Sequence, residues 1–63
     1  MIGKRIRALR TQAGLTQDEL AAKVGVSRVY IAQMETGKQD NPTLKVLRAL
    51  AKALRVDVAK LIR

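Results

Sequence analysis

Residues 16–37 read TQDELAAKVGVSRVYIAQMETG, and this stretch decides the fold that we predict. Thr16 followed three residues later by Glu19 is a capping box, a pattern that begins helices. The helix that starts there should end at Gly25, and Ser27 is the expected N-cap of the next helix. Two helices joined by a turn of about three or four residues that contains glycine form a helix-turn-helix unit.

The apolar residues inside this unit fit two helices that cross closely. The small Ala21 falls where the helices should come nearest, and Val26, Ile31 and Met34 supply the apolar side of the second helix. Generic helical hairpins also contain glycine and alanine, so the spacing alone leaves such a hairpin open. The combination with the capping box favours the helix-turn-helix over residues 16–36.

Turn and cap signals divide the rest of the chain into three further helices, and no alternating period predicts a strand. The first helix should end at Gly14, and Pro42 places a loop over residues 36–42 because proline cannot continue a helix. The fourth should begin near Thr43, and Asp57 should cap the fifth. The residues expected to face inward are Ile2, Ile6, Leu9 and Ala13 in the first helix and Leu44, Leu47, Leu50, Ala51 and Leu54 in the fourth, and the fifth should end with Leu61 and Ile62. We therefore predict an all-α chain, a compact five-helix bundle that forms a single domain over residues 1–63.

Composition narrows the possible functions. The 63 residues include no cysteine and no histidine, so we expect no disulfide, metal or cofactor, and the five acidic residues suggest no paired catalytic carboxylates and no enzyme. Thirteen lysines and arginines give a net charge of +8, which favours a polyanionic partner. Nucleic acid leads, and an anionic membrane surface is the rival. No apolar run suggests a membrane span or a signal peptide, so we expect a cytoplasmic protein.

The chain resembles the Cro/C1-type helix-turn-helix (XRE-like) family, which includes the lambdoid phage repressors. The resemblance rests on LRTQAGLTQDELAAKVGVSRVYIAQMETGK at residues 9–38, on Pro42, and on LRALAKALRVDVAKLI at residues 47–62. It implies a lambda-repressor-like domain that binds operator DNA, usually as a two-fold dimer, with the third helix in the major groove. Four residues separate Gly37 from Pro42, where three are frequent in the family, so the path of this loop is not implied.

The third helix has two different faces when it is drawn with about 100° per residue. Ile31, Met34 and Glu35 share one face, which should be buried. The other face should contact bases, because arginine can pair with guanine, an amide with adenine, and a small apolar side chain can touch the thymine methyl. The candidate base contacts are Arg28, Val29, Ala32 and Gln33. The alternatives are an exposed face that is poor in lysine and glutamate by chance, and contacts from Arg28 or Gln33 to phosphate.

Several polar residues around this helix are candidates for phosphate contacts. Gln17 opens the second helix, where unpaired N–H groups suit a phosphate, and the matching family glutamine fixes the protein on the strand. The Tyr30 hydroxyl is placed to reach a phosphate, although a packing role for its ring is equally open. The remaining candidates surround the loop and are Lys38, Gln39, Asn41 and Thr43, with solubility as the alternative explanation.

Two charged residues are assigned a structural role. Glu35 lies near the C-terminal end of its helix, where the helix dipole disfavours a negative charge and a cationic partner is wanted. The resemblance implies that Arg10 is this partner, in an ion pair that joins the first helix to the third.

The leading functional hypothesis is sequence-specific binding of double-stranded DNA by a transcriptional regulator, and a repressor that binds a palindromic operator as a homodimer is the specific form we expect. Candidate dimer contacts are Val56, Val58 and Ile62, each of which has completion of the core as its alternative. A second hypothesis is an antitoxin that neutralises a toxin or another protein partner and regulates its own synthesis. A third, a basic peptide on a membrane surface, requires folding only on lipid.

Overall fold

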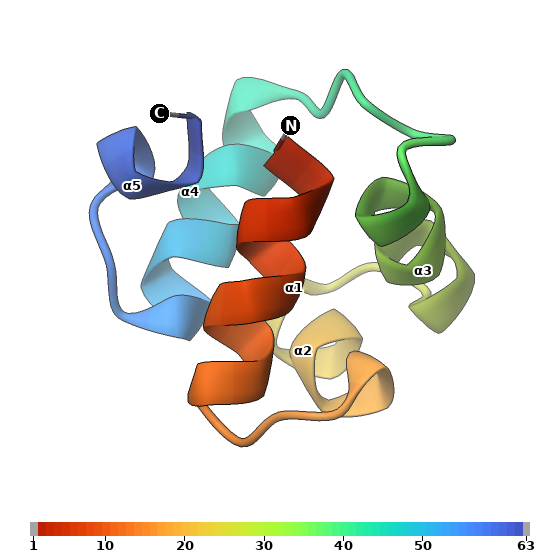
Figure 1. The fold of residues 1–63 in the computed structure, drawn as a ribbon, viewed down its shortest axis with the longest axis horizontal. Helices are drawn as coiled ribbons and strands as arrows, with labels where there is room; N and C mark the ends of the chain where they lie inside the picture. Colours follow the sequence, from red (N-terminus) through yellow and green to blue (C-terminus); the bar gives the residue numbers. More distant parts are fainter. Residues whose placement is uncertain (1, 63) are drawn as a thin grey trace.

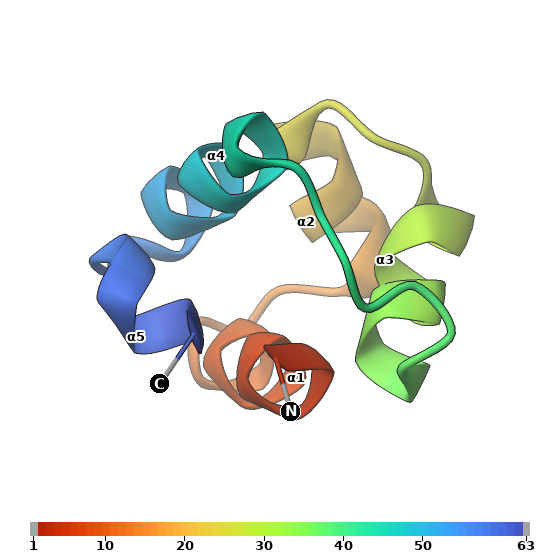
Figure 2. The same cartoon turned by 90° about the horizontal axis from the view of Figure 1, so that it is seen from above.

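The computed structural model describes residues 2–62 and confirms the all-α prediction. Its helices are α1 (Ile2–Gln12), α2 (Gln17–Val24), α3 (Arg28–Thr36), α4 (Leu44–Leu54) and α5 (Val58–Ile62). Figures 1 and 2 show them arranged around a common centre, with α3 and α5 at opposite ends of the molecule and α1 between them. α1 packs against α3 and α5, while α2 packs against α3 and α4.

Side-chain caps begin the two helices of the helix-turn-helix where the sequence predicts them. The Thr16 hydroxyl accepts a hydrogen bond from the Glu19 amide at 3.0 Å, and the Glu19 carboxylate accepts one from the Thr16 amide at 2.8 Å. This is the predicted capping box. The Ser27 hydroxyl accepts from the Tyr30 amide at 3.0 Å and caps α3.

Left-handed backbone conformations end four of the described helices, and the one after α1 is at the predicted stop, Gly14, with φ of 74°. Gly25 and Gly37 follow α2 and α3 with φ angles of 88° and 87°, which glycine adopts without a steric penalty. The same position after α4 holds Arg55 with φ of 58°. A residue with a Cβ is strained in this conformation, and nothing in the sequence singled out Arg55 for it.

The last two helices begin with different kinds of contact. Thr43 caps α4 as predicted, since its hydroxyl accepts from the Val46 amide at 3.2 Å. Asp57 directly precedes α5 as predicted, but among the hydrogen bonds of residues 2–62 its side chain makes none that caps the helix. The Lys60 amide donates to the Asp57 backbone carbonyl at 2.9 Å.

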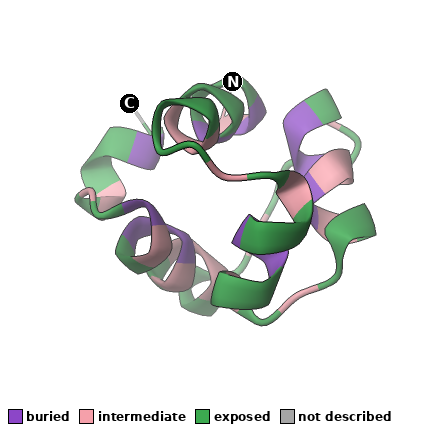
Figure 3. Cartoon of the chain, turned by 90° about the horizontal axis from the view of Figure 1, so that it is seen from below, coloured by how far each residue is buried: buried purple, intermediate pink, exposed green. Residues whose placement is uncertain are grey.

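An aliphatic core fills the centre between the helices. Figure 3 shows the buried segments turned toward this centre and the exposed ones facing outward. The side chains with no exposed surface are Ile6, Leu20, Ile31, Met34, Leu50 and Leu61, and each of the five helices contributes at least one of them. Ala21 is 3% exposed, which agrees with the predicted close crossing of α2 and α3.

Two predicted inward positions, Leu44 and Ala13, were wrong. Leu44 is 57% exposed because it is the first residue of α4, and the buried residues of this helix, Leu50, Ala51 and Leu54, all lie in its second half. Ala13 is exposed because α1 has already ended at Gln12. Ile62 at the end of α5 is 61% exposed while Leu61 has no exposed surface, so the alternative that Ile62 completes the core is wrong.

Gly3 permits a close approach that the sequence analysis did not anticipate. It is buried in the first turn of α1, and a Cβ at this position would lie 2.0 Å from the main-chain carbonyl oxygen of Met34. No side chain fits at that distance. The backbone of α1 therefore rests directly on the C-terminal half of α3 and fixes where this helix lies.

Candidate nucleic-acid interface

The inner face of α3 is buried as the helical wheel predicts. Ile31 and Met34 have no exposed surface, and Glu35 is 8% exposed. Two apolar side chains and one carboxylate therefore attach the helix to the core. The carboxylate needs partners there, because an unpaired buried charge is costly.

Arg10 from α1 is the main partner of this carboxylate, and the predicted ion pair is present. Its Nε lies 2.6 Å from Glu35 Oε2, and its Nη2 donates to Oε1 at 3.1 Å, so the guanidinium engages both oxygens. The side chains are 14% and 3% exposed. The hydrogen bond to Glu35 raises the pKa of Arg10 despite the opposing effect of burial. Arg10 Nη1 also donates to the Leu15 carbonyl at 2.8 Å, which ties α1 to the start of the helix-turn-helix.

Gln17 is the third member of this network, a contact that the sequence analysis missed. Its Nε2 donates to Glu35 Oε1 at 3.1 Å, and the residue is half-buried. Glu35 thereby receives hydrogen bonds from both α1 and α2. The sequence assigned Gln17 to phosphate only, and no local pattern signals its contact with a residue 18 positions further along the chain.

The outer face of α3 is graded from exposed to half-buried. Val29 is 55% exposed, and Arg28 beside it is also exposed. Ala32 and Gln33 are half-buried, although the wheel placed them fully outward. All four remain accessible from one side, and the chemical groups on it are a guanidinium, an amide and two small apolar side chains.

Asp18 is a carboxylate next to this outer face that the sequence analysis did not place there. Its Oδ1 lies 3.6 Å from Arg28 Nε, and the two side chains are 77% and 55% exposed. Asp18 precedes Glu19, whose carboxylate closes the capping box. The first turn of α2 thus contacts both ends of α3, through Gln17 to Glu35 and through Asp18 to Arg28.

The other candidate phosphate contacts lie on or beside α3. Tyr30 is half-buried and packs against the core, which confirms the packing role of its ring. The phosphate contact of its hydroxyl stays a prediction. Lys38 and Asn41 are exposed in the loop that Figure 2 shows running from α3 to α4. Gln39 in the same loop is half-buried, and its main-chain N–H donates to the main-chain carbonyl of Gln33 at 3.0 Å. The exposed Thr43 uses its hydroxyl oxygen as the cap of α4.

The candidate dimer residues differ in burial. Val56 and Val58 are half-buried and pack against the core. Ile62 is exposed. It belongs to α5, which lies across the molecule from α3 in Figure 1. Of the three, Ile62 therefore has the most apolar surface available for another molecule.

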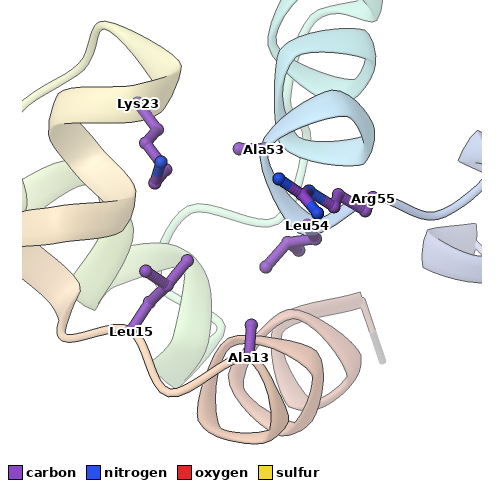
Figure 4. A pocket seen from close by; sticks show the side chains of 6 residues that line it. All are labelled: Ala13, Leu15, Lys23, Ala53, Leu54 and Arg55. Atoms are coloured by element: carbon purple, nitrogen blue, oxygen red, sulfur yellow. The ribbon is translucent and has the colours of Figure 1, made fainter.

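A hollow of 330 Å³ lies on a different side of the molecule from the outer face of α3. Figure 4 shows it between α2, α4 and the end of α1, with Lys23 reaching into it and Arg55 beside Leu54. Its lining residues are Ala13, Leu15, Lys23, Ala53, Leu54 and Arg55. None of the residues proposed to contact DNA takes part in it. Within residues 2–62, no helix has the length and apolar character that crossing a membrane requires.

Comparisons with known proteins agree with this arrangement. A family model described as helix-turn-helix matches residues 6–61. An immunity repressor protein of Bacillus phage phi105 is 41% identical over 61 residues, which cover 97% of this chain and 42% of the repressor. The chain spans about half the length of the curated relatives that it matches.

Solved structures of DNA complexes have the same fold. The biofilm master regulator SinR in complex with DNA superposes with a TM-score of 0.96 at 36% identity, with all of both chains covered. The P22 c2 repressor in complex with a synthetic operator gives a TM-score of 0.90 at 39% identity, and covers 97% of this chain and 91% of the repressor chain.

Proposed function

The chain belongs to the Cro/C1-type helix-turn-helix family, and from this premise we propose that it binds double-stranded DNA sequence-specifically as a cytoplasmic transcriptional regulator. α3 enters the major groove with its outer face toward the bases. The main support is the contrast between the two faces of this helix. One is fixed to α1 and α2 through Glu35, while the other presents Arg28 and Val29 to solvent.

The side chains on the outer face supply the contacts that base edges need. Arg28 can donate two hydrogen bonds to guanine, and the Gln33 amide can pair with adenine. Val29 and Ala32 offer apolar surface to a thymine methyl group. Phosphate contacts from residues around α3 fix the register of the protein on the duplex, and we assign them to Gln17, Tyr30, Lys38, Asn41 and Thr43.

We propose that the regulator is a repressor that occupies a palindromic operator as a homodimer. Relatives named as an immunity repressor and a structure of a repressor bound to a synthetic operator support this form. Two such units would meet half-sites about 34 Å apart, one turn of the duplex. The exposed Ile62 is our first candidate for a dimer contact, and Val56 and Val58, which also pack against the core, are the others.

Selection of binding sites from random duplexes tests the proposal directly. We expect a short palindromic site, with tighter binding of the selected duplex than of a scrambled one at physiological salt. Arg28→Gln and Gln33→Ala should change the recovered bases and cost about 1–3 kcal/mol on the original site. Lys38→Ala should weaken all duplexes alike and reduce the slope of log affinity against log salt by about one.

Two results would contradict the proposal. Equal binding of selected and scrambled duplexes by the unaltered chain would remove sequence-specific recognition. Unchanged base preferences in both the Arg28 and the Gln33 variants would show that the bases are contacted by a surface other than the outer face of α3. In that case the two faces of α3 would need another explanation.

A further inference from the structure

Asp18 lies in the first turn of α2, where the helix dipole favours a carboxylate, but the dipole does not explain why this carboxylate lies beside Arg28. Its carboxylate is 77% exposed, and the capping box beside it is closed by Glu19. In a protein of net charge +8 that is proposed to bind a polyanion, a carboxylate beside α3 opposes the general attraction to phosphate. Asp18 therefore does not increase the affinity of the protein for DNA, and another effect on binding must be considered.

Stability explains the place of the carboxylate on α2, but not its pairing with Arg28. The ion pair of Asp18 with Arg28 is exposed on both sides, and its 3.6 Å separation exceeds the usual length of a charge-assisted hydrogen bond, about 2.7–2.9 Å. Exposed pairs of this kind contribute little to folding. Loss of Asp18 should leave α2 and α3 in place, because Thr16, Glu19 and Ser27 make the caps of both helices.

The side of Arg28 that faces Asp18 shows what the pair can do. The carboxylate approaches Nε, one edge of the planar guanidinium, so the two terminal amino groups can still donate to another partner. Those two groups match the O6 and N7 acceptors of a guanine edge. A carboxylate on the Nε edge also offsets the positive charge that would draw Arg28 to any phosphate, whichever bases lie nearby.

We propose that Asp18 is a positioning residue that makes Arg28 selective, by holding its guanidinium toward a base edge and weakening its attraction to phosphate. This inference rests on the proposed function. It predicts that Asp18 lowers the affinity for random duplex more than the affinity for the selected site. The gain is discrimination between sites.

The test measures binding of the Asp18→Asn variant to the selected and to a scrambled duplex over a range of salt concentrations. We expect tighter binding of the scrambled duplex, a ratio of selected to scrambled affinity that falls by about ten-fold, and a salt slope steeper by about one as Arg28 turns to phosphate. Asp18→Glu keeps the charge and should retain most of the discrimination. Thermal unfolding of each variant verifies that the fold is intact.

Asp57→Asn is the matched control. It removes the same charge from an exposed residue that precedes α5, far along the chain from α3. This variant should change both duplexes alike. In the Arg28→Gln background, Asp18→Asn should no longer alter the ratio, because the residue through which it acts is gone.

The possible outcomes separate this inference from the proposed function. If Asp18→Asn and Asp57→Asn change both duplexes by the same factor, Asp18 acts only through net charge and the inference is overturned. The same conclusion follows if Asp18→Asn alters the ratio equally with and without Arg28. If the unaltered chain does not distinguish the two duplexes at all, the proposed function itself fails.

Discussion

Two arginine–carboxylate pairs join α3 to its neighbouring helices, and they differ in how far they are exposed to solvent. Arg10 and Glu35 are 14% and 3% exposed, and they are joined by two hydrogen bonds with Gln17 as a third member. Arg28 and Asp18 are 55% and 77% exposed and lie 3.6 Å apart. The same two chemical groups therefore serve stability where water is excluded and remain available to another partner where it is not.

Removal of Arg10 should have the largest effect on this comparison. Arg10→Ala leaves the buried Glu35 carboxylate with Gln17 as its remaining described side-chain partner. Loss of one member of a buried pair costs about 3–5 kcal/mol, so we expect a loss near the lower end of this range. Urea unfolding followed by circular dichroism measures it.

Arg28→Ala is the matched experiment on the exposed pair. It removes the same kind of side chain from the same helix, and we expect a change in unfolding free energy within about 0.5 kcal/mol. If the two alanine variants lost similar stability, the contrast between the pairs would be wrong. Arg10→Lys, which keeps the charge but not the two-pronged geometry, should fall between them.

Gly3→Ala should have the next largest effect, because it disturbs the same buried side of α3 without changing any charge. The new Cβ would meet the Met34 carbonyl oxygen at 2.0 Å, so α1 and α3 must move apart. Overpacking of this kind costs about 1–3 kcal/mol, although alanine favours helix more than glycine does. Thermal unfolding measures the loss, and Arg7→Ala at an exposed position of α1 is the control. A Gly3→Ala variant as stable as the unaltered chain would show that the contact is easily relieved.

The smallest effect is expected in a pH titration, which tests whether an exposed carboxylate can still contribute to stability. Glu19 is exposed like Asp18, yet the hydrogen bond from the Thr16 backbone amide, assisted by the Thr16 side chain, lowers its pKa. Its contribution to stability is therefore present above the ordinary glutamate value of about 4.3 and is lost as the pH falls through the lowered pKa of the folded state. Glu19→Gln should flatten this part of the curve of unfolding free energy against pH. An unchanged curve would mean that the capping carboxylate does not contribute.

The sequence predicted those features that depend on neighbouring residues. Thr16, Ser27 and Thr43 cap their helices as expected, because a cap involves residues about three positions apart. The division of α3 into a buried and an accessible face follows from its 3.6-residue period for the same reason. Leu44 shows where periodicity fails, since the pattern does not tell how far the core extends along a helix.

Apart from the close crossing of α2 and α3 at Ala21, contacts between distant residues were predicted only where the family resemblance implied them. The pair of Arg10 and Glu35 came from that resemblance. Gly3 against Met34, Gln17 against Glu35 and Asp18 against Arg28 did not, because each depends on how two helices cross in space. The proposed base and phosphate contacts remain predictions, which the site selection described above is designed to test.

The amide of Gln17 carries two hydrogens, and only one of them is required for its bond to Glu35. If a strand of DNA lies where we propose, the second hydrogen can reach a phosphate while the first stays in place. One planar group would then connect the duplex to the buried carboxylate and, through it, to Arg10 on α1. Docking would need no rearrangement of the interior, so the shape that the bases meet is already set before the encounter.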